Sequence, residues 1–110
     1  MTGERVAGLR VQRAGQWFQV GALRIVRLDR RASLQRILSA LAGAHAKERG
    51  MRQQELVEIG WPGEQILADA AATRVRVAIA TLRRLGLREH LVTTADGYRL
   101  DPGAVVEVCD

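Results

Sequence analysis

Residues 70–99 constrain the fold of this chain more than any other stretch. Between positions 70 and 85, apolar residues recur at helical spacing, which predicts one amphipathic helix with about 100° between successive side chains. Val75, Ile79 and Leu82 form its buried stripe, together with neighbouring alanines. The opposite side, called here the basic face, holds Thr73, Arg74, Arg76, Val77, Thr81, Arg83 and Arg84. Its arginines repel one another unless an anion lies opposite, so this face indicates an anionic partner.

The residues that flank this helix predict where it begins and ends. Asp69 is expected to cap the N-terminus, because its carboxylate can accept from free N–H groups of the first turn. Gly86 is expected to end the helix, with Leu87 folding back as the apolar contact. Residues 90–101 then alternate around Asp96-Gly97, a strong signal for a β-hairpin. A basic helix that leads directly into a small hairpin is typical of a winged helix-turn-helix domain.

The same residues resemble the effector domains of OmpR/PhoB-type winged-helix proteins, which are bacterial regulators. That family has V-x-V-x-I-x-x-L-R-R in the helix and G-Y-R-L at the end of the wing. This chain has V-R-V-A-I-A-T-L-R-R at 75–84 and G-Y-R-L at 97–100. Residues 54–61 are similar to the family's preceding helix, which also ends on a tryptophan. The resemblance implies an α+β fold with short N-terminal antiparallel strands, three helices and a C-terminal β-hairpin wing, without a receiver domain.

The remaining segments fit one winged-helix domain over residues 1–110. We expect residues 1–5 to be flexible, 6–28 to form strands that include Leu23 and Ile25, and 29–49 to form a helix capped by Asp29 and stopped at Gly50. The expected core stripe of that helix is Leu34, Ile37, Leu38, Leu41 and Ala42.

A second helix is predicted over 53–60, followed by a buried Trp61 and by inward-packed Ile66 and Leu67. The tail, residues 102–110, can be a last strand, a frayed end or a partner-binding segment. The sequence leaves this open.

Composition narrows the function. The chain has 17 basic and 12 acidic residues, a net charge of +5, and Lys47 is its only lysine. Arginine reads phosphate and guanine well because its planar fork donates two bonds at once. A GC-rich genome would also raise the arginine content, although it would not explain where the arginines lie.

Other classes of function find little support in the sequence. Cys109 is the single cysteine, and His45 and His90 are expected at the surface or at helix ends, so neither a disulfide nor a metal site is predicted. We expect no cofactor, no catalytic residues and no membrane partner, and a cytoplasmic location, because apolar runs of spanning length and a signal peptide are lacking.

Three functions therefore compete: a DNA-binding transcription regulator, a winged-helix adapter that binds a protein through the same basic face, and an enzyme. For the first, double-stranded DNA is the partner, with RNA polymerase or another regulatory chain and oligomerisation on DNA as further possibilities. The base-contact candidates are Thr73, Val77, Thr81 and Arg84; the phosphate candidates are Arg74, Arg76 and Arg83; those in the wing are Thr93, Thr94 and Arg99. An acidic Asp96 at the wing tip predicts weak wing contact with phosphate.

Overall fold

The computed structural model describes residues 7–110, so the flexible segment expected at residues 1–5 lies outside the described part. The elements follow one another along the chain as β1 (Leu9–Gln12), β2 (Trp17–Val20), β3 (Val26–Arg27), α1 (Ala32–Ala46), β4 (Met51–Arg52), α2 (Gln53–Gly60), α3 (Ala68–Leu82), a π-helical turn η1 (Arg83–Leu87), β5 (Leu91–Thr93), β6 (Gly97–Leu100) and β7 (Val106–Cys109).

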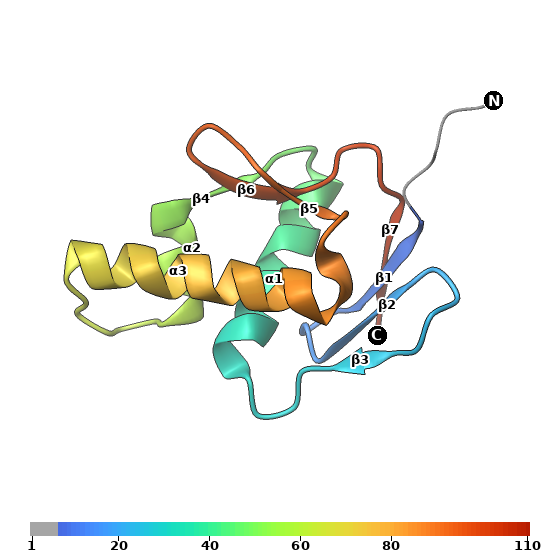
Figure 1. The fold of residues 1–110 in the computed structure, drawn as a ribbon, viewed down its shortest axis with the longest axis horizontal. Coiled ribbons are helices and arrows are strands. Elements are labelled where there is room, and N and C mark those ends of the chain that lie inside the picture. The colour runs from blue at the N-terminus through green and yellow to red at the C-terminus, as the bar shows by residue number, and fades with distance from the viewer. Residues whose placement is uncertain (1–6) are drawn as a thin grey trace.

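Two small sheets pack against the helices. The four-stranded sheet has the order β3-β2-β1-β7, and its first three strands are antiparallel. The tail forms β7, which pairs in parallel with β1 and places Val106 opposite Leu9. The second sheet has the order β4-β6-β5, and its β5–β6 hairpin is the wing. In Figure 1 the helices lie to the left of the four-stranded sheet, and the wing lies above them.

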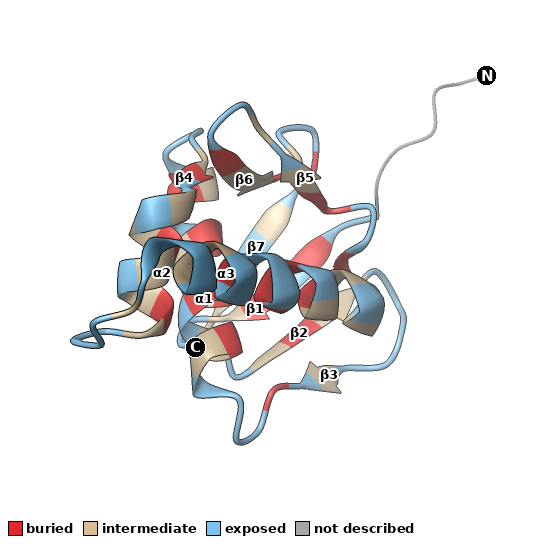
Figure 2. Cartoon of the chain, turned by 60° about the vertical axis from the view of Figure 1, so that its left-hand side comes forward, coloured by how far each residue is buried: buried red, intermediate tan, exposed pale blue. Residues whose placement is uncertain are grey.

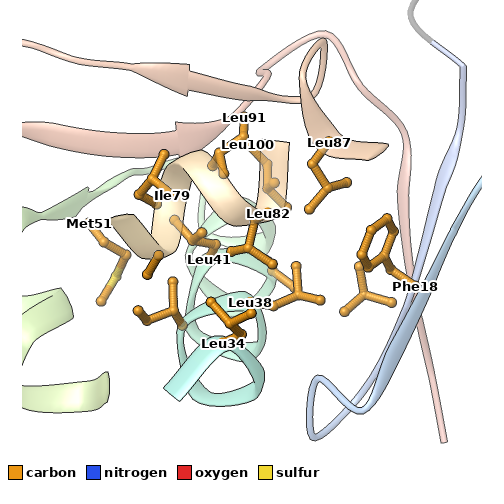
Figure 3. Packing of buried hydrophobic residues seen from close by; sticks show 14 of the residues in the cluster. Phe18, Leu34, Leu38, Leu41, Met51, Ile79, Leu82, Leu87, Leu91 and Leu100 are labelled. Atoms are coloured by element: carbon orange, nitrogen blue, oxygen red, sulfur yellow. The ribbon is translucent and has the colours of Figure 1, made fainter. Parts of the chain in front are cut away.

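The core is built around α1, as its apolar periodicity predicts. Leu34, Ile37, Leu38, Leu41 and Ala42 are all buried, and so are Val75, Ala78, Ile79 and Leu82 on α3. Figure 3 shows Leu38 and Leu41 of α1 pointing toward Leu82 of α3, with Phe18 of β2 completing the cluster on the side of the large sheet. Both predicted stripes are confirmed.

The predicted ends of α1 are wrong. The helix begins after Arg31 and not at Asp29, and no side chain caps its first turn. It ends at Ala46, because Glu48 takes a left-handed conformation with a φ of 56°. Gly50 does not stop the helix but allows a close approach of strands, since a Cβ there would lie 2.9 Å from the carbonyl oxygen of Tyr98.

Three expectations about exposed loops and helix starts are also wrong. Leu23 and Ile25 lie outside β3 and are 67% and 44% exposed, because a tight turn at Gly21 ends the preceding strand. Leu67 is 84% exposed instead of packing inward, and it occupies the N-cap position of α3. Asp69 is therefore the second residue of the helix. Its negative charge interacts favourably with the positive end of the helix dipole, but its side chain does not cap the helix.

The burial of two ring side chains, His90 and Trp61, differs from what the sequence predicts. His90 was expected at the surface or at a helix end. It follows the end of η1 by three residues, but it is only 2% exposed, and its Nε2 lies 2.6 Å from the carbonyl oxygen of Ala7. Trp61 is half-buried, packed against the core and covered by the Arg74 guanidinium, so it does not plug the core as predicted.

Gly97 has a different role from the one its sequence suggests. The hairpin closes with the Thr94 N–H donating to the carbonyl of Gly97 at 2.9 Å, so Ala95 and Asp96 form the two-residue turn. Gly97 does not have the positive φ that an Asp-Gly turn of type I′ requires. It is needed because β4 pairs with β6 there, and a Cβ would overlap the carbonyl group of Met51.

We predict that Gly97→Ala destabilises the domain by about 1–3 kcal/mol, because the new methyl group forces β4 and β6 apart. Gly43→Ala is the matched control: this glycine lies within α1, and a Cβ there meets nothing within 4 Å. It should stabilise the chain by about 0.5–1 kcal/mol. Urea denaturation of both variants tests this prediction. An unchanged midpoint for Gly97→Ala would contradict the close approach of β4 and β6 at Gly97.

Glu55 organises the start of α2. Its carboxylate accepts the backbone N–H of Arg52 at 2.8 Å and also two bonds from the Arg49 Nη2, each of 3.2 Å. The bond from the Arg52 N–H, followed by the contact with Arg49, lowers the pKa of Glu55 below its usual 4.5. Arg52 therefore stands where a polar cap residue is usual, and Glu55, at the third position of the helix, binds the N–H of this N-cap residue.

This lowered pKa predicts a pH-dependent contribution to stability. Because Glu55 binds its proton less tightly in the folded chain, its contribution is fully present above pH 4.5 and is lost as the pH falls through the folded pKa. The difference in free energy of unfolding between the wild type and Glu55→Gln should therefore shrink as the pH is lowered from about 7 to about 2. A difference that stays constant over this range would show that the ionised carboxylate is not what stabilises α2.

Candidate nucleic-acid interface

The helix predicted over 70–85 is α3, which ends at Leu82, continued by η1, which holds Arg83 and Arg84. The basic face of these two elements is open to solvent along most of its length. Figure 2 shows the helix lying across the molecule with its outer side exposed and its inner side buried. Thr73, Arg74, Arg76, Val77 and Arg84 are exposed, whereas Thr81 and Arg83 are half-buried. Val77 is 58% exposed, which is unusual for an apolar residue in the middle of a helix that has a complete core stripe elsewhere.

Two arginines of this face remain available to a partner. Within residues 7–110, no carboxylate lies within 4.0 Å of Arg76 or Arg84. Arg76 makes one contact within the chain, a bond of 3.3 Å from its Nη2 to the Thr73 Oγ1. Arg84 is exposed and lies in the same outward-facing row of side chains as Thr73, Val77 and Thr81. These two guanidinium groups keep most of their donors for an anion or a base.

The threonines of α3 present methyl groups and acceptors instead of free donors. The Thr73 hydroxyl donates to the carbonyl of Asp69 at 3.0 Å, and the Thr81 hydroxyl donates to the carbonyl of Val77 at 2.8 Å. Such bonds to the preceding turn are common for threonine in helices. A partner of this face would therefore meet an oxygen lone pair and a methyl group at each position.

Arg74 is held by residues of the connection between α2 and α3. Its Nη1 lies 2.9 Å from a carboxylate oxygen of Glu64, and its guanidinium lies 5.7 Å from the centre of the Trp61 ring. Both partners of the ion pair are about half exposed, with side-chain exposures of 43% and 52%. An exposed pair of this kind contributes about 0–1 kcal/mol, so a phosphate can compete with Glu64 for Arg74.

Arg83 contacts the wing directly. Its Nε donates to the carbonyl of Leu91 at 3.0 Å, and its Nη2 donates to the Thr93 Oγ1 at 3.0 Å. The guanidinium also lies 5.8 Å from the centre of the Tyr98 ring. The predicted phosphate anchor thus has a role inside the chain that its sequence position did not indicate.

The structure separates the three candidates of the wing. Thr93 pairs with Tyr98 and faces Arg83, so its hydroxyl is already engaged. Thr94 is half-buried at the turn. Arg99 pairs with Val92 one residue further along, which places it on the opposite face of the hairpin, where it is half-buried. The structure therefore brings Arg83 and Thr93 together and leaves Arg99 apart.

Tyr98 is the residue of this interface that sequence reasoning missed. It lies directly opposite Thr93 in the hairpin and covers one side of the Arg83 guanidinium. A two-residue turn at Ala95-Asp96 would have predicted this cross-strand pair. Across the described part of the chain, no group of three or more metal-binding side chains occurs, and no helix is long and apolar enough to traverse a bilayer.

Comparisons with known proteins address the fold. Neither a protein-family model nor a curated protein sequence matches this chain. Its structure is similar to that of the DNA-binding domain of E. coli CadC, with a TM-score of 0.55 and 14% sequence identity. The match covers 89% of this chain and 94% of that domain. At this low identity the likeness shows the fold alone, which is the winged helix that the sequence predicts.

Proposed function

We propose that this chain binds double-stranded DNA by placing α3 in the major groove, and that it regulates transcription. The observation that carries the proposal is the exposure of the basic face, on which Arg76 and Arg84 lack carboxylate partners among residues 7–110 and the apolar Val77 is 58% exposed. The fold supports it, since a similar structure is a DNA-binding domain.

The dimensions of the row suit a groove. Thr73 and Arg84 are eleven residues apart, which corresponds to about 16 Å along the helix at ~1.5 Å per residue. That length spans about five base pairs. Val77 and Arg84 lie within about 20° of each other around the helix axis, so both would face the base edges. Arg84 suits the O6 and N7 acceptors of guanine, and Val77 suits a thymine methyl group.

The remaining candidates are assigned to the phosphate backbone. Arg76 lies at the edge of the row, and Arg74 can exchange Glu64 for a phosphate. The wing would lie beside the backbone, with Asp96 at its tip weakening that contact. We predict RNA polymerase or another regulatory chain as a second partner, and binding of more than one copy to the operator. No catalytic activity is expected.

The main competing function is a protein adapter that uses the same basic face. An acidic partner would also pair with Arg76 and Arg84, and Val77 would then pack against its apolar side chains. The two functions differ in their response to salt, because each phosphate that an arginine neutralises releases counterions. They also differ in base preference, since an adapter touches no base.

We predict that Arg84→Ala relaxes the base preference at one position of the binding site, at a cost of about 1–3 kcal/mol in discrimination, because it removes a contact to guanine. Val77→Ala should more mildly reduce the preference for a thymine. Selection of binding sites from random duplexes, run for the wild type and both variants in one buffer, measures this. An accompanying salt titration should show duplex affinity that falls steeply with salt.

Arg31→Ala is the control, because it removes an exposed arginine at the start of α1, outside the basic face. It should leave the base preference unchanged. Identical preference profiles for the wild type, Arg84→Ala and Val77→Ala would contradict groove binding, even if all three proteins bind DNA without specificity.

A further inference from the structure

We infer that Arg83 is a positioning residue that fixes the wing against α3, so that helix and wing meet one duplex as a rigid unit. This inference rests on the proposed function for its consequence on DNA. The attachment itself is an observation on the free chain. It changes the role of Arg83 from a phosphate contact to a connection between the two parts that would touch DNA.

Three groups of the wing surround the Arg83 side chain. The Leu91 carbonyl and the Thr93 hydroxyl accept from two different nitrogens of the guanidinium, each at 3.0 Å. Tyr98, on the adjacent strand, lies under the guanidinium at 5.8 Å from its ring centre. Residues 91, 93, 98 and 100 share one face of the hairpin, and Leu91 and Leu100 are buried. Arg83 thus contacts the outer, more exposed half of that face, beyond the core.

Arginine is required for this geometry. The Nε–H and an Nη2–H leave the planar guanidinium in fixed directions, so one side chain reaches a carbonyl of β5 and a hydroxyl two residues further along. Its flat surface also packs on an aromatic ring. A lysine would retain the positive charge but could not hold both acceptors and the ring together. The substitution Arg83→Lys therefore separates the role of geometry from the role of charge.

The attachments of the wing elsewhere make this contact important. Leu91 and Leu100 enter the core at the base of the wing. Beside the turn, β6 is already fastened, because Tyr98 and Gly97 pair with Met51 and Arg52 of β4 and the Gln53 N–H donates to the carbonyl of Asp96 at 3.1 Å. The other strand of the hairpin, β5, is the edge of this sheet, and Arg83 fastens it through Leu91 and Thr93. The position of β5 relative to the basic face therefore depends on this guanidinium, whereas β4 and Gln53 hold the β6 side of the wing.

Hydrogen exchange without DNA tests the attachment. In Arg83→Lys, the amides of residues 92–94 should exchange roughly tenfold faster, because the bonds from a charged donor to β5 are lost. Arg88→Lys is the matched control, since Arg88 is exposed and lies next to the helix end, and it should leave these amides unchanged. Equal exchange in Arg83→Lys and wild type, with both folded by circular dichroism, would overturn the inference.

A double-mutant cycle on DNA tests the consequence. Asp96→Asn removes a negative charge from the wing tip, so it should raise the affinity for duplex DNA by about two- to fivefold if the tip lies near phosphate. In the Arg83→Lys background, where β5 is no longer held by the guanidinium, the gain should be smaller although the charge at position 83 is retained. An equal gain in both backgrounds, or no gain in the wild type, would overturn the inference.

The two arms separate this inference from the proposed function. If the wild type binds no duplex, groove binding fails, and hydrogen exchange still decides whether Arg83 holds the wing. If the wild type binds duplex DNA and Asp96→Asn raises the affinity equally in both backgrounds, DNA binding stands and the positioning role is overturned. If Arg83 only stabilised the fold, Arg83→Lys would lower the free energy of unfolding without reducing the gain in affinity from Asp96→Asn. The cycle therefore distinguishes a positioning role from a role in stability alone.

Discussion

Burial of the apolar face of α1 is the interaction on which the rest of the structure depends. Ile37, Leu38 and Leu41 are fully buried, and around them pack Phe18 from the large sheet, Leu82 from α3 and Leu100 from the wing. Burying such side chains contributes about 1.5–3 kcal/mol each. Because both sheets and α3 meet on this one helix, its position fixes the orientation of α3 and leaves the basic face outside.

The four arginines of the basic face fall into two pairs, one bound within the chain and one open to solvent. Arg74 and Arg83 are engaged within the chain, with Glu64 and with the wing, whereas Arg76 and Arg84 face solvent without a carboxylate among the described residues. This division has a physical basis. Four cations on one short face would destabilise the helix by mutual repulsion, and internal partners for two of them reduce it while leaving two for an external anion.

The periodic elements could be predicted from the sequence, and the tertiary contacts could not. The stripes of α1 and α3 were correct because burial of one helix face leaves a regular pattern. The strand β4, of only two residues, leaves no such pattern, and it explains both Gly50 and Gly97, which close approach requires. The parallel pairing of β7 with β1 joins the two ends of the chain, which local propensity does not encode. At the site, the exposed residues followed from helix geometry, but the partner of Arg83 depends on the register of a hairpin whose turn was misplaced by one residue.

In the proposed complex, the outer side of α3 and the wing meet duplex DNA together. Titration of the 15N-labelled chain with a selected duplex, followed by amide chemical shifts, tests it most directly. We expect the largest shifts on residues 73–84 of α3 and η1 and on residues 93–97 of the wing, whereas amides of β1, β2 and β7 should change little. Shifts concentrated on the four-stranded sheet, with α3 unaffected, would contradict it.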